Sequence, residues 1–241
     1  MKIEKICSVN IALILLFIAA QFLMKYIPNS SDRLAVAQES YSAKGKSEID
    51  NEWAYFLINE EFPLEKGYTP ELAQVQGTFM MDERCAEYAR EMIKAAEEDG
   101  VYLNVVSAYR SIQKQQENLE AYTQRLIAEG MSEEDARAAA LTEIAEPGTS
   151  EHNAGLSLDI LTNDWWETHD DVTADFENTE EFLWLQSNAH KYGFILRYPE
   201  EWEHVTGYTY EPWHYRFVGV YYANEIRQSD LPFEYYYKLN F

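Results

Sequence analysis

The chain is poor in cysteine, histidine and positive charge. Only 2 cysteines and 5 histidines occur among its 241 residues, so a four-cysteine zinc cluster is impossible and any metal site must use histidine and carboxylate ligands. The sequence has 19 Lys and Arg residues against 42 Asp and Glu residues, a formal net charge of −23. Phosphate binding and docking on anionic membranes both need clustered Lys and Arg. This balance therefore argues against nucleic acid and against an anionic membrane surface as partners.

Long apolar runs are also scarce, and the one that stands out, from Ile11 to Met24, follows Lys2 and Lys5. Lysines ahead of such a run are typical of a cleaved signal peptide or of a single membrane anchor. The run has about 14 residues, short of the roughly 20 that span a bilayer. A cleavage-like pattern of small residues at 35–37 lies far beyond the run, which favours an uncleaved anchor. In both cases the lysines stay inside and the rest of the chain faces out, so membrane contact is expected through this segment only.

The whole chain is predicted to consist of a leader, a tether and one domain. The signal peptide or anchor is expected at residues 1–27, a polar tether at 28–52 and the domain at 53–241. Caps and apolar spacing predict helices over 82–99, 111–130, 132–145, 179–193 and 219–227, with an aromatic tail after the last. Apolar runs predict strands over 101–109, from 156, over 194–198 and over 213–218. Helices and strands mix without regular βαβ spacing, so the fold class is α+β with antiparallel strands.

The stretch TSEHNAGLSLDI, residues 149–160, places His152 seven positions ahead of Asp159. An odd separation puts two residues on opposite faces of a continuous strand, so the chain must bend between them for both to reach one site. Gly155 permits such a bend or a close backbone approach. Asp159 is flanked by apolar residues, where an ionised carboxylate is costly unless it is paired or metal-bound. A metal ligand and an aspartate that caps a turn or pairs with an arginine are both open at this point.

A second stretch, TGYTYEPWHYRFVG at residues 206–219, supplies the pair Glu211 and His214. A catalytic zinc site needs three protein ligands and an open position, with a carboxylate nearby as general base. His214 would complete a His-Asp-His set, and Glu211 would take the proton from the attacking water. The alternative is an ordinary core histidine at the end of a strand. The other histidines, at 169, 190 and 204, lie in polar or helical surroundings and are expected to be structural or exposed.

Taken together, SxHxxGxxxD, then ExxH, with SAYRSIQKQQ upstream, resemble the zinc D-alanyl-D-alanine carboxypeptidases of the VanY type, including the related L,D-carboxypeptidases. The similarity runs from about residue 62 to 238. It implies a single zinc peptidase domain of the Hedgehog/DD-peptidase type, with a central antiparallel sheet and flanking helices. It also implies one zinc ion bound by His152, Asp159 and His214, with Glu211 as general base. Ser157 departs from the pattern, since the family usually has alanine there.

The same resemblance implies roles for residues around the metal. Arg110, in SAYRS, would neutralise the oxyanion that develops on the scissile carbonyl; a surface cation at a helix start is the alternative. The substrate-binding candidates are Ser107, Gln115, Ser150, Trp213, Tyr208 and Tyr210. The first three match polar positions that would touch the peptide stem, and the three aromatic residues could form a wall or could simply pack in the core.

The expected function is the zinc-dependent removal of the C-terminal D-alanine from peptidoglycan stem peptides. The enzyme is expected to be a monomer anchored on the outer face of a bacterial cell membrane, or secreted if the leader is cleaved. An L,D-carboxypeptidase that trims tetrapeptide stems is the nearest alternative, followed by a peptidoglycan endopeptidase. A non-catalytic zinc-bearing module that binds the wall is disfavoured, because such a module needs neither the base Glu211 nor the cation Arg110. The acidic segment 162–178, with Trp165 and Trp166, is predicted to be a surface loop that could tune specificity.

Overall fold

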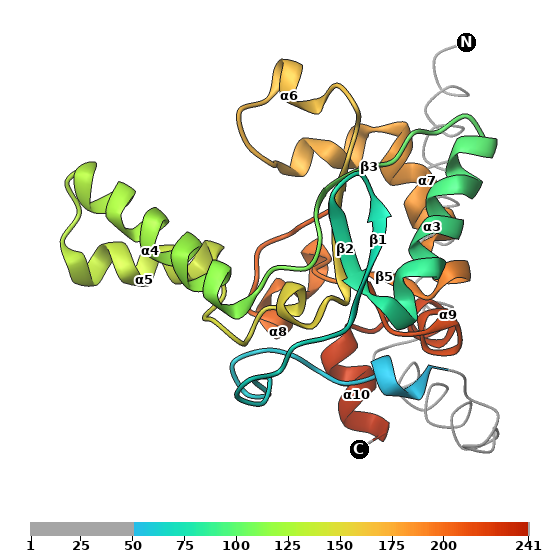
Figure 1. Ribbon diagram of the computed structural model, residues 1–241, viewed down its shortest axis with the longest axis horizontal. Coiled ribbons are helices and arrows are strands. Elements are labelled where there is room, and N and C mark those ends of the chain that lie inside the picture. The colour runs from blue at the N-terminus through green and yellow to red at the C-terminus, as the bar shows by residue number, and fades with distance from the viewer. Residues whose placement is uncertain (1–50, 241) are drawn as a thin grey trace, which may run out of the picture.

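The computed structural model describes residues 51–240. The predicted anchor, Cys7 and nearly all of the predicted tether lie outside these residues, so the leader stays a prediction. Within the described part of the chain, no helix is both long enough and apolar enough to cross a bilayer. The predicted α+β class is confirmed by an antiparallel sheet with helices around it (Figure 1).

The centre of the fold is a four-stranded antiparallel sheet in the order β3-β4-β6-β5. Its strands are β3 (Asn104–Ser107), β4 (Ser157–Leu161), β6 (His214–Phe217) and β5 (Phe194–Leu196). Each lies in or at the edge of a segment that the sequence predicts as a strand. The register places Asp159 opposite Ser107 on one side and opposite His214 on the other. Segments far apart in the chain therefore meet at one row of the sheet.

A second, two-stranded sheet precedes the first long helix and was not predicted. It consists of β1 (Leu72–Gln76) and β2 (Phe79–Asp82), joined by a turn at Gly77. Of β1, only Val75 is buried, so the segment lacks the alternation of buried and exposed apolar residues that marks a strand. The hairpin packs on α3 (Glu83–Glu98), which the side chain of Asp82 caps as predicted.

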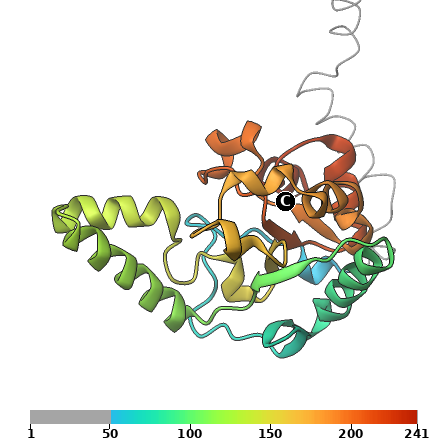
Figure 2. The ribbon, with the colours of Figure 1, turned by 90° about the horizontal axis from the view of Figure 1, so that it is seen from above.

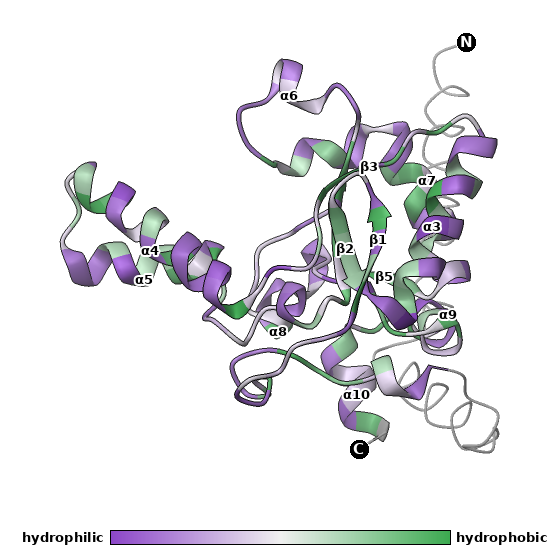
Figure 3. Ribbon diagram, viewed as in Figure 1, coloured by the Kyte–Doolittle hydropathy of each residue, from purple (hydrophilic) through white to green (hydrophobic). Residues whose placement is uncertain are grey.

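The helices divide into a group that covers the sheet and a pair that projects from it. α3, α7 (Glu180–Asn188) and α9 (Val220–Ser229) lie together on one side, where Figure 3 shows hydrophobic residues on α7 and hydrophilic ones over much of α3. α4 (Ile112–Ala128) and α5 (Glu133–Glu143) form a helical hairpin that extends away from the domain (Figure 2). Side chains of Ser111 and Ser132 cap these two helices, which confirms both predicted helix starts.

Two predicted segments differ in the structure. The acidic segment 162–178 is not a plain surface loop, because it contains α6 (Trp165–Thr168) and a 3₁₀ turn at Ala174–Asn178. Trp165 is only 3% exposed and stacks on His169, whereas Trp166 is 52% exposed. The burial of Trp165 could not be predicted, because most of the residues around it in the sequence are acidic or polar. The aromatic tail is a helix, α10 (Phe233–Asn240), whose Phe233 and Tyr236 pack against Tyr55 near the other end of the domain.

Candidate active site

The structure brings the three predicted metal ligands together. His152 Nε2 lies 3.2 Å from Asp159 Oδ2, and His214 Nδ1 lies 3.0 Å from Asp159 Oδ1. One ligand atom from each residue lies within 4.8 Å of the others. Zinc bonds of about 2.0–2.2 Å in tetrahedral geometry separate neighbouring ligand atoms by roughly 3.3 Å. The trio therefore has the atom types and spacing that a zinc ion needs.

A bend at Gly155 allows His152 and Asp159 to converge. His152 lies in a 3₁₀ turn, Glu151–Ala154, which ends at Gly155 with φ of +70°. The carbonyl of Gly155 accepts a hydrogen bond of 2.9 Å from the backbone N–H of Asp82, and a Cβ at this position would lie 2.8 Å from that nitrogen. Both the left-handed backbone and the close approach require glycine. The predicted bend is confirmed, with β4 beginning at Ser157, one residue later than expected.

Hydrogen bonds orient both imidazole rings toward the same point. His152 Nδ1 donates to the backbone carbonyl of Ala108 at 2.7 Å, which leaves its Nε2 lone pair directed at Asp159. His214 Nε2 lies 3.3 Å from the carboxylate of Glu151, which leaves its Nδ1 directed at Asp159. Metal-binding histidines commonly use their second nitrogen in this way. The two rings are thus arranged as ligands rather than as core fillers.

The electrostatics of the trio also suit a cation. Burial lowers the pKa of His152, which keeps that ring neutral. Burial would lower the pKa of His214 as well, but hydrogen bonds to Asp159 and Glu151 outweigh it and raise the pKa to about 10. Although burial works against ionisation, the neighbouring His152 and His214 hold the pKa of Asp159 well below its usual range. Without a metal the carboxylates hold a proton on His214, and a dication can replace that charge.

Glu211 lies beside the trio without belonging to it. Its Oε2 is 3.7 Å from His214 Nδ1, and its side chain is 20% exposed. Its backbone N–H donates to the carbonyl of Tyr198, and its own carbonyl accepts from the N–H of His214, both at 3.1 Å. Burial raises its pKa to about 7; nearby carboxylates, Asp159 first, add to this and the cationic His214 opposes it. A carboxyl group that titrates near neutrality suits a general base, and an adjacent dication would lower that pKa.

Arg110 faces the same space from the turn after β3. Its guanidinium donates to Gln115 Oε1 at 3.0 Å and to Ser107 Oγ at 3.1 Å. Its backbone is tied to the histidine turn, since its N–H donates to the carbonyl of His152 and its carbonyl accepts from the side chain of Asn153. Ser107 and Gln115 therefore position the guanidinium, and the backbone ties keep it close to the trio.

A cavity of about 390 Å³ connects these groups. Of the predicted residues, its lining includes Arg110, Gln115, Ser150, His152, Asp159, Tyr208, Glu211, Trp213 and His214. Ser107 contacts it only through Arg110. Tyr210 is outside the lining, with its backbone N–H bonded to Glu203. The lining also contains Asn118, Tyr122 and Arg125 of α4, Glu143 to Ala145 after α5, and Asp171 and Val172 of the acidic segment. These eight residues were not predicted, because only the fold brings the projecting hairpin and the acidic segment to this site.

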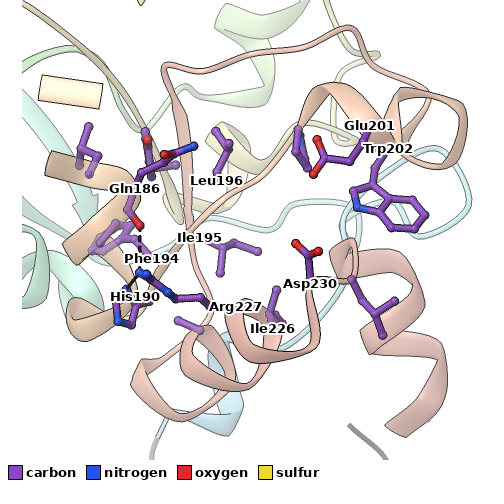
Figure 4. A pocket seen from close by; sticks show the side chains of 16 residues that line it. Gln186, His190, Phe194, Ile195, Leu196, Glu201, Trp202, Ile226, Arg227 and Asp230 are labelled. Atoms are coloured by element: carbon purple, nitrogen blue, oxygen red, sulfur yellow. Dashed lines mark hydrogen bonds between the residues drawn. The ribbon is translucent and has the colours of Figure 1, made fainter. Parts of the chain in front are cut away.

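A second cavity, of about 340 Å³, lies between β5, α7 and α9 (Figure 4). Its walls are mixed, with Ile195 and Ile226 at its centre and charged groups such as Glu201, Arg227 and Asp230 around them. Of the predicted catalytic, metal-binding and substrate-binding residues, none lines it. The reactive groups thus converge on the first cavity.

Behind His214 lies a buried charge network that the sequence did not predict. Glu151 accepts hydrogen bonds from Arg197 and Arg216, and Arg197 also donates to Glu234. All four residues are at most 5% exposed. One signal was available: Arg216 lies two positions after His214 in a strand and so shares its face. The other members carry no local signal of burial.

Comparisons with known proteins point to one family. Residues 78–220 match the profile of the VanY family, D-alanyl-D-alanine carboxypeptidase. A D-alanyl-D-alanine carboxypeptidase of Enterococcus faecalis is 36% identical over 200 residues, which cover 83% of this chain and 71% of that protein. The structure resembles that of a vancomycin-resistance D,D-pentapeptidase, VanY of a VanB-type cassette, solved as a mutant with Zn(II). That match has a TM-score of 0.67 and 38% identity, over 77% of this chain and 99% of the other. The LdcB LD-carboxypeptidase matches with a TM-score of 0.63 and 32% identity, over 76% and 84% of the two chains.

Proposed function

Because the chain belongs to the VanY family of D-alanyl-D-alanine carboxypeptidases, we propose that the first cavity is its active site and that it removes the C-terminal D-alanine of peptidoglycan stem peptides. The chain is a zinc metallocarboxypeptidase. The observation that carries the assignment to this cavity is the cluster of His152, Asp159 and His214, whose ligand atoms lie within 4.8 Å. Glu211 and Arg110 line the same cavity.

Each residue around the cluster has a separate task. His152, Asp159 and His214 would hold one zinc ion. Bound there, zinc would supply a Lewis acid that polarises the scissile carbonyl and makes a water molecule more acidic. Glu211, with a pKa raised by burial, takes the proton from the attacking water. The guanidinium of Arg110 faces the carbonyl oxygen as negative charge develops on it.

The hydrolytic step balances with these groups alone. The water oxygen forms a bond to the carbonyl carbon before the last D-alanine, and the carbon–nitrogen bond breaks. Glu211 delivers the proton that it took from water to the departing amine nitrogen, and D-alanine leaves. The largely buried Glu211 carboxylate lies near His214, at 3.7 Å, so it can serve first the water oxygen and then the amine nitrogen.

Substrate contacts follow from the lining of the cavity. We propose that Ser150, Tyr208 and Trp213 contact the stem peptide directly. Gln115 and Ser107 act through Arg110, whose guanidinium they hold. Tyr210 takes no part in this proposal, because it lies outside the lining.

Removal of D-alanine from a tetrapeptide stem, an L,D-carboxypeptidase reaction, is the second candidate. The similarity to the LdcB LD-carboxypeptidase supports it. The same zinc, base and cation would serve both reactions, and only the configuration of the residue before the terminal D-alanine differs.

Full-length protein with zinc should be incubated with defined pentapeptide and tetrapeptide stems, and the masses of the products measured by mass spectrometry. Loss of one alanine from the pentapeptide alone supports the D,D reaction, and loss from the tetrapeptide alone supports the L,D reaction. Release of a dipeptide or a cut in the stem interior would indicate an endopeptidase, and no product would favour a binding module.

We further propose that the enzyme acts as a monomer outside the cell, held by its leader. Support comes from Lys2 and Lys5 ahead of the apolar run Ile11 to Met24, which orient such a segment with its lysines inside. Fractionation of cells expressing the full chain checks this: the protein should stay with membranes and be degraded by external protease. Recovery from the cytosol would contradict it, and size-exclusion chromatography in detergent tests the monomer.

A further inference from the structure

Glu151, the residue before the metal ligand His152, is completely enclosed by cationic and hydrogen-bonding groups. Its side chain is 0% exposed. One carboxylate oxygen, Oε1, accepts from Arg197 Nε at 2.7 Å and from Arg216 Nη1 at 2.9 Å. The other, Oε2, lies 3.3 Å from Nε2 of His214. The two oxygens thus have different partners: arginines on one side and the metal ligand on the other.

The arginines are held from both ends of the domain. Arg216 Nη2 donates to the backbone carbonyls of Ala54 and Phe56, each at 2.9 Å. Arg197 donates a pair of hydrogen bonds to Glu234 of α10. Two glutamates and two arginines balance in charge, which a buried cluster requires. Glu151 therefore cannot rotate without breaking charged hydrogen bonds, and Oε2 is fixed in front of His214.

This arrangement determines which nitrogen of His214 carries a proton. A carboxylate can only accept, so Oε2 requires a proton on Nε2 of His214. Nδ1 faces Asp159 at 3.0 Å, and its proton is the one that a metal ion can displace, after which Nδ1 offers its lone pair to the ion. We propose that Glu151 is a positioning residue for the metal site: it selects the ring form of His214 that binds the ion through Nδ1. The inference rests on the proposed zinc-dependent function and extends it to a residue outside the metal trio.

Replacing Glu151 with glutamine should weaken zinc binding, although the two side chains have nearly the same shape. The substituted amide has one acceptor oxygen and one donor nitrogen. Arg197 and Arg216 can only donate, so they will hold the oxygen and leave the amide N–H₂ facing Nε2 of His214. The ring must then accept at Nε2 and carry its proton on Nδ1, where it blocks the metal. A near-isosteric change should therefore weaken zinc binding by about 10- to 100-fold, the range for losing such an outer partner.

Glu234→Gln is the matched control. Glu234 belongs to the same buried network and is 5% exposed, but its contacts are with Arg197. This variant also removes one buried negative charge and should lower the melting temperature, while its zinc affinity should stay within about threefold of the wild type. Zinc dissociation constants come from competition with a chelator on the full-length proteins. Thermal unfolding of the metal-free proteins reports stability separately.

The outcomes separate the possibilities. A loss of zinc affinity in Glu151→Gln alone supports the proposal. Equal losses in both variants, or none in either, overturn it, because Glu151 would then act only through packing or not at all. If Glu151→Gln fails to fold, nitrogen NMR of the zinc-loaded wild type decides: a proton on Nε2 of His214 supports the proposal, and a proton on Nδ1 refutes it. Wild-type protein that neither binds zinc nor releases D-alanine would instead contradict the proposed function.

Discussion

Glu211→Gln isolates the proton-transfer step from metal binding. The substitution keeps side-chain length and both backbone hydrogen bonds of residue 211, to Tyr198 and from His214. It removes the carboxylate whose pKa burial raises to about 7. An amide cannot accept a proton at neutral pH, so the attacking water and the departing amine both lose their proton carrier. Glu211 is not one of the three clustered ligands, so zinc should remain bound.

The expected cost follows from what a positioned base contributes. General acid–base groups supply about 10²- to 10⁴-fold, so kcat for D-alanine release should fall at least about 100-fold, or about 2.7 kcal/mol at 1.36 kcal/mol per tenfold. Release of D-alanine from a pentapeptide stem is the assay, with zinc content measured on the same samples. Glu143→Gln is the control, because it removes another carboxylate from the lining of the same cavity and should change kcat less than about threefold. Near-normal turnover in Glu211→Gln, or an equal loss in both variants, would refute the assignment of the base.

Three further substitutions test the rest of the site. Asp159→Ala should sharply lower zinc affinity, and unchanged metal content after dialysis would reject Asp159 as a ligand. Arg110→Ala should keep zinc but lower kcat by roughly 10²- to 10³-fold, the usual cost of losing an oxyanion partner; an effect confined to KM would make it a substrate-binding cation instead. Gly155→Ala should lower the free energy of unfolding by about 2 kcal/mol or more, since φ is +70° and the new Cβ meets the backbone of Asp82 at 2.8 Å. Denaturant unfolding measures that loss, and a change below about 0.5 kcal/mol would contradict the close approach.

Local signals in the sequence were sufficient for the helices and for the bend at the metal site. Asp82, Ser111 and Ser132 each cap a helix with their own side chains, and capping is a property of a few consecutive residues. Gly155 follows the same logic, because a left-handed turn between two candidate ligands leaves few residue choices. These features could be predicted because their causes lie within one turn of chain.

The convergence of the ligands needed more than local signals. Asp159 and His214 are 55 residues apart and meet because β4 and β6 pair in one register. A shift of one residue would turn one of the two to the opposite face of the sheet. Spacing alone left both residues with ordinary structural alternatives, and only the joint motif favoured a metal site. The acidic segment shows the converse, since its many charged residues gave no sign that its Trp165 and Phe176 are buried.

The buried arginines lay furthest from prediction, and the reason concerns how the site is built. An arginine within a short strand would ordinarily be placed at the surface, because burying a charge without a partner is costly. Arg197 and Arg216 can be buried because both pair with Glu151, and Arg197 also pairs with Glu234. These partners are distant in sequence: Glu151 is 46 residues from Arg197 and 65 from Arg216, and Glu234 is 37 residues from Arg197. The carbonyls of Ala54 and Phe56, some 160 residues earlier, complete the shell of Arg216. The ring of His214, a proposed metal ligand, is thus oriented through contacts that reach the first and last elements of the described domain. The geometry of the proposed metal site therefore depends on contacts from both ends of the domain, which no local stretch of sequence displays.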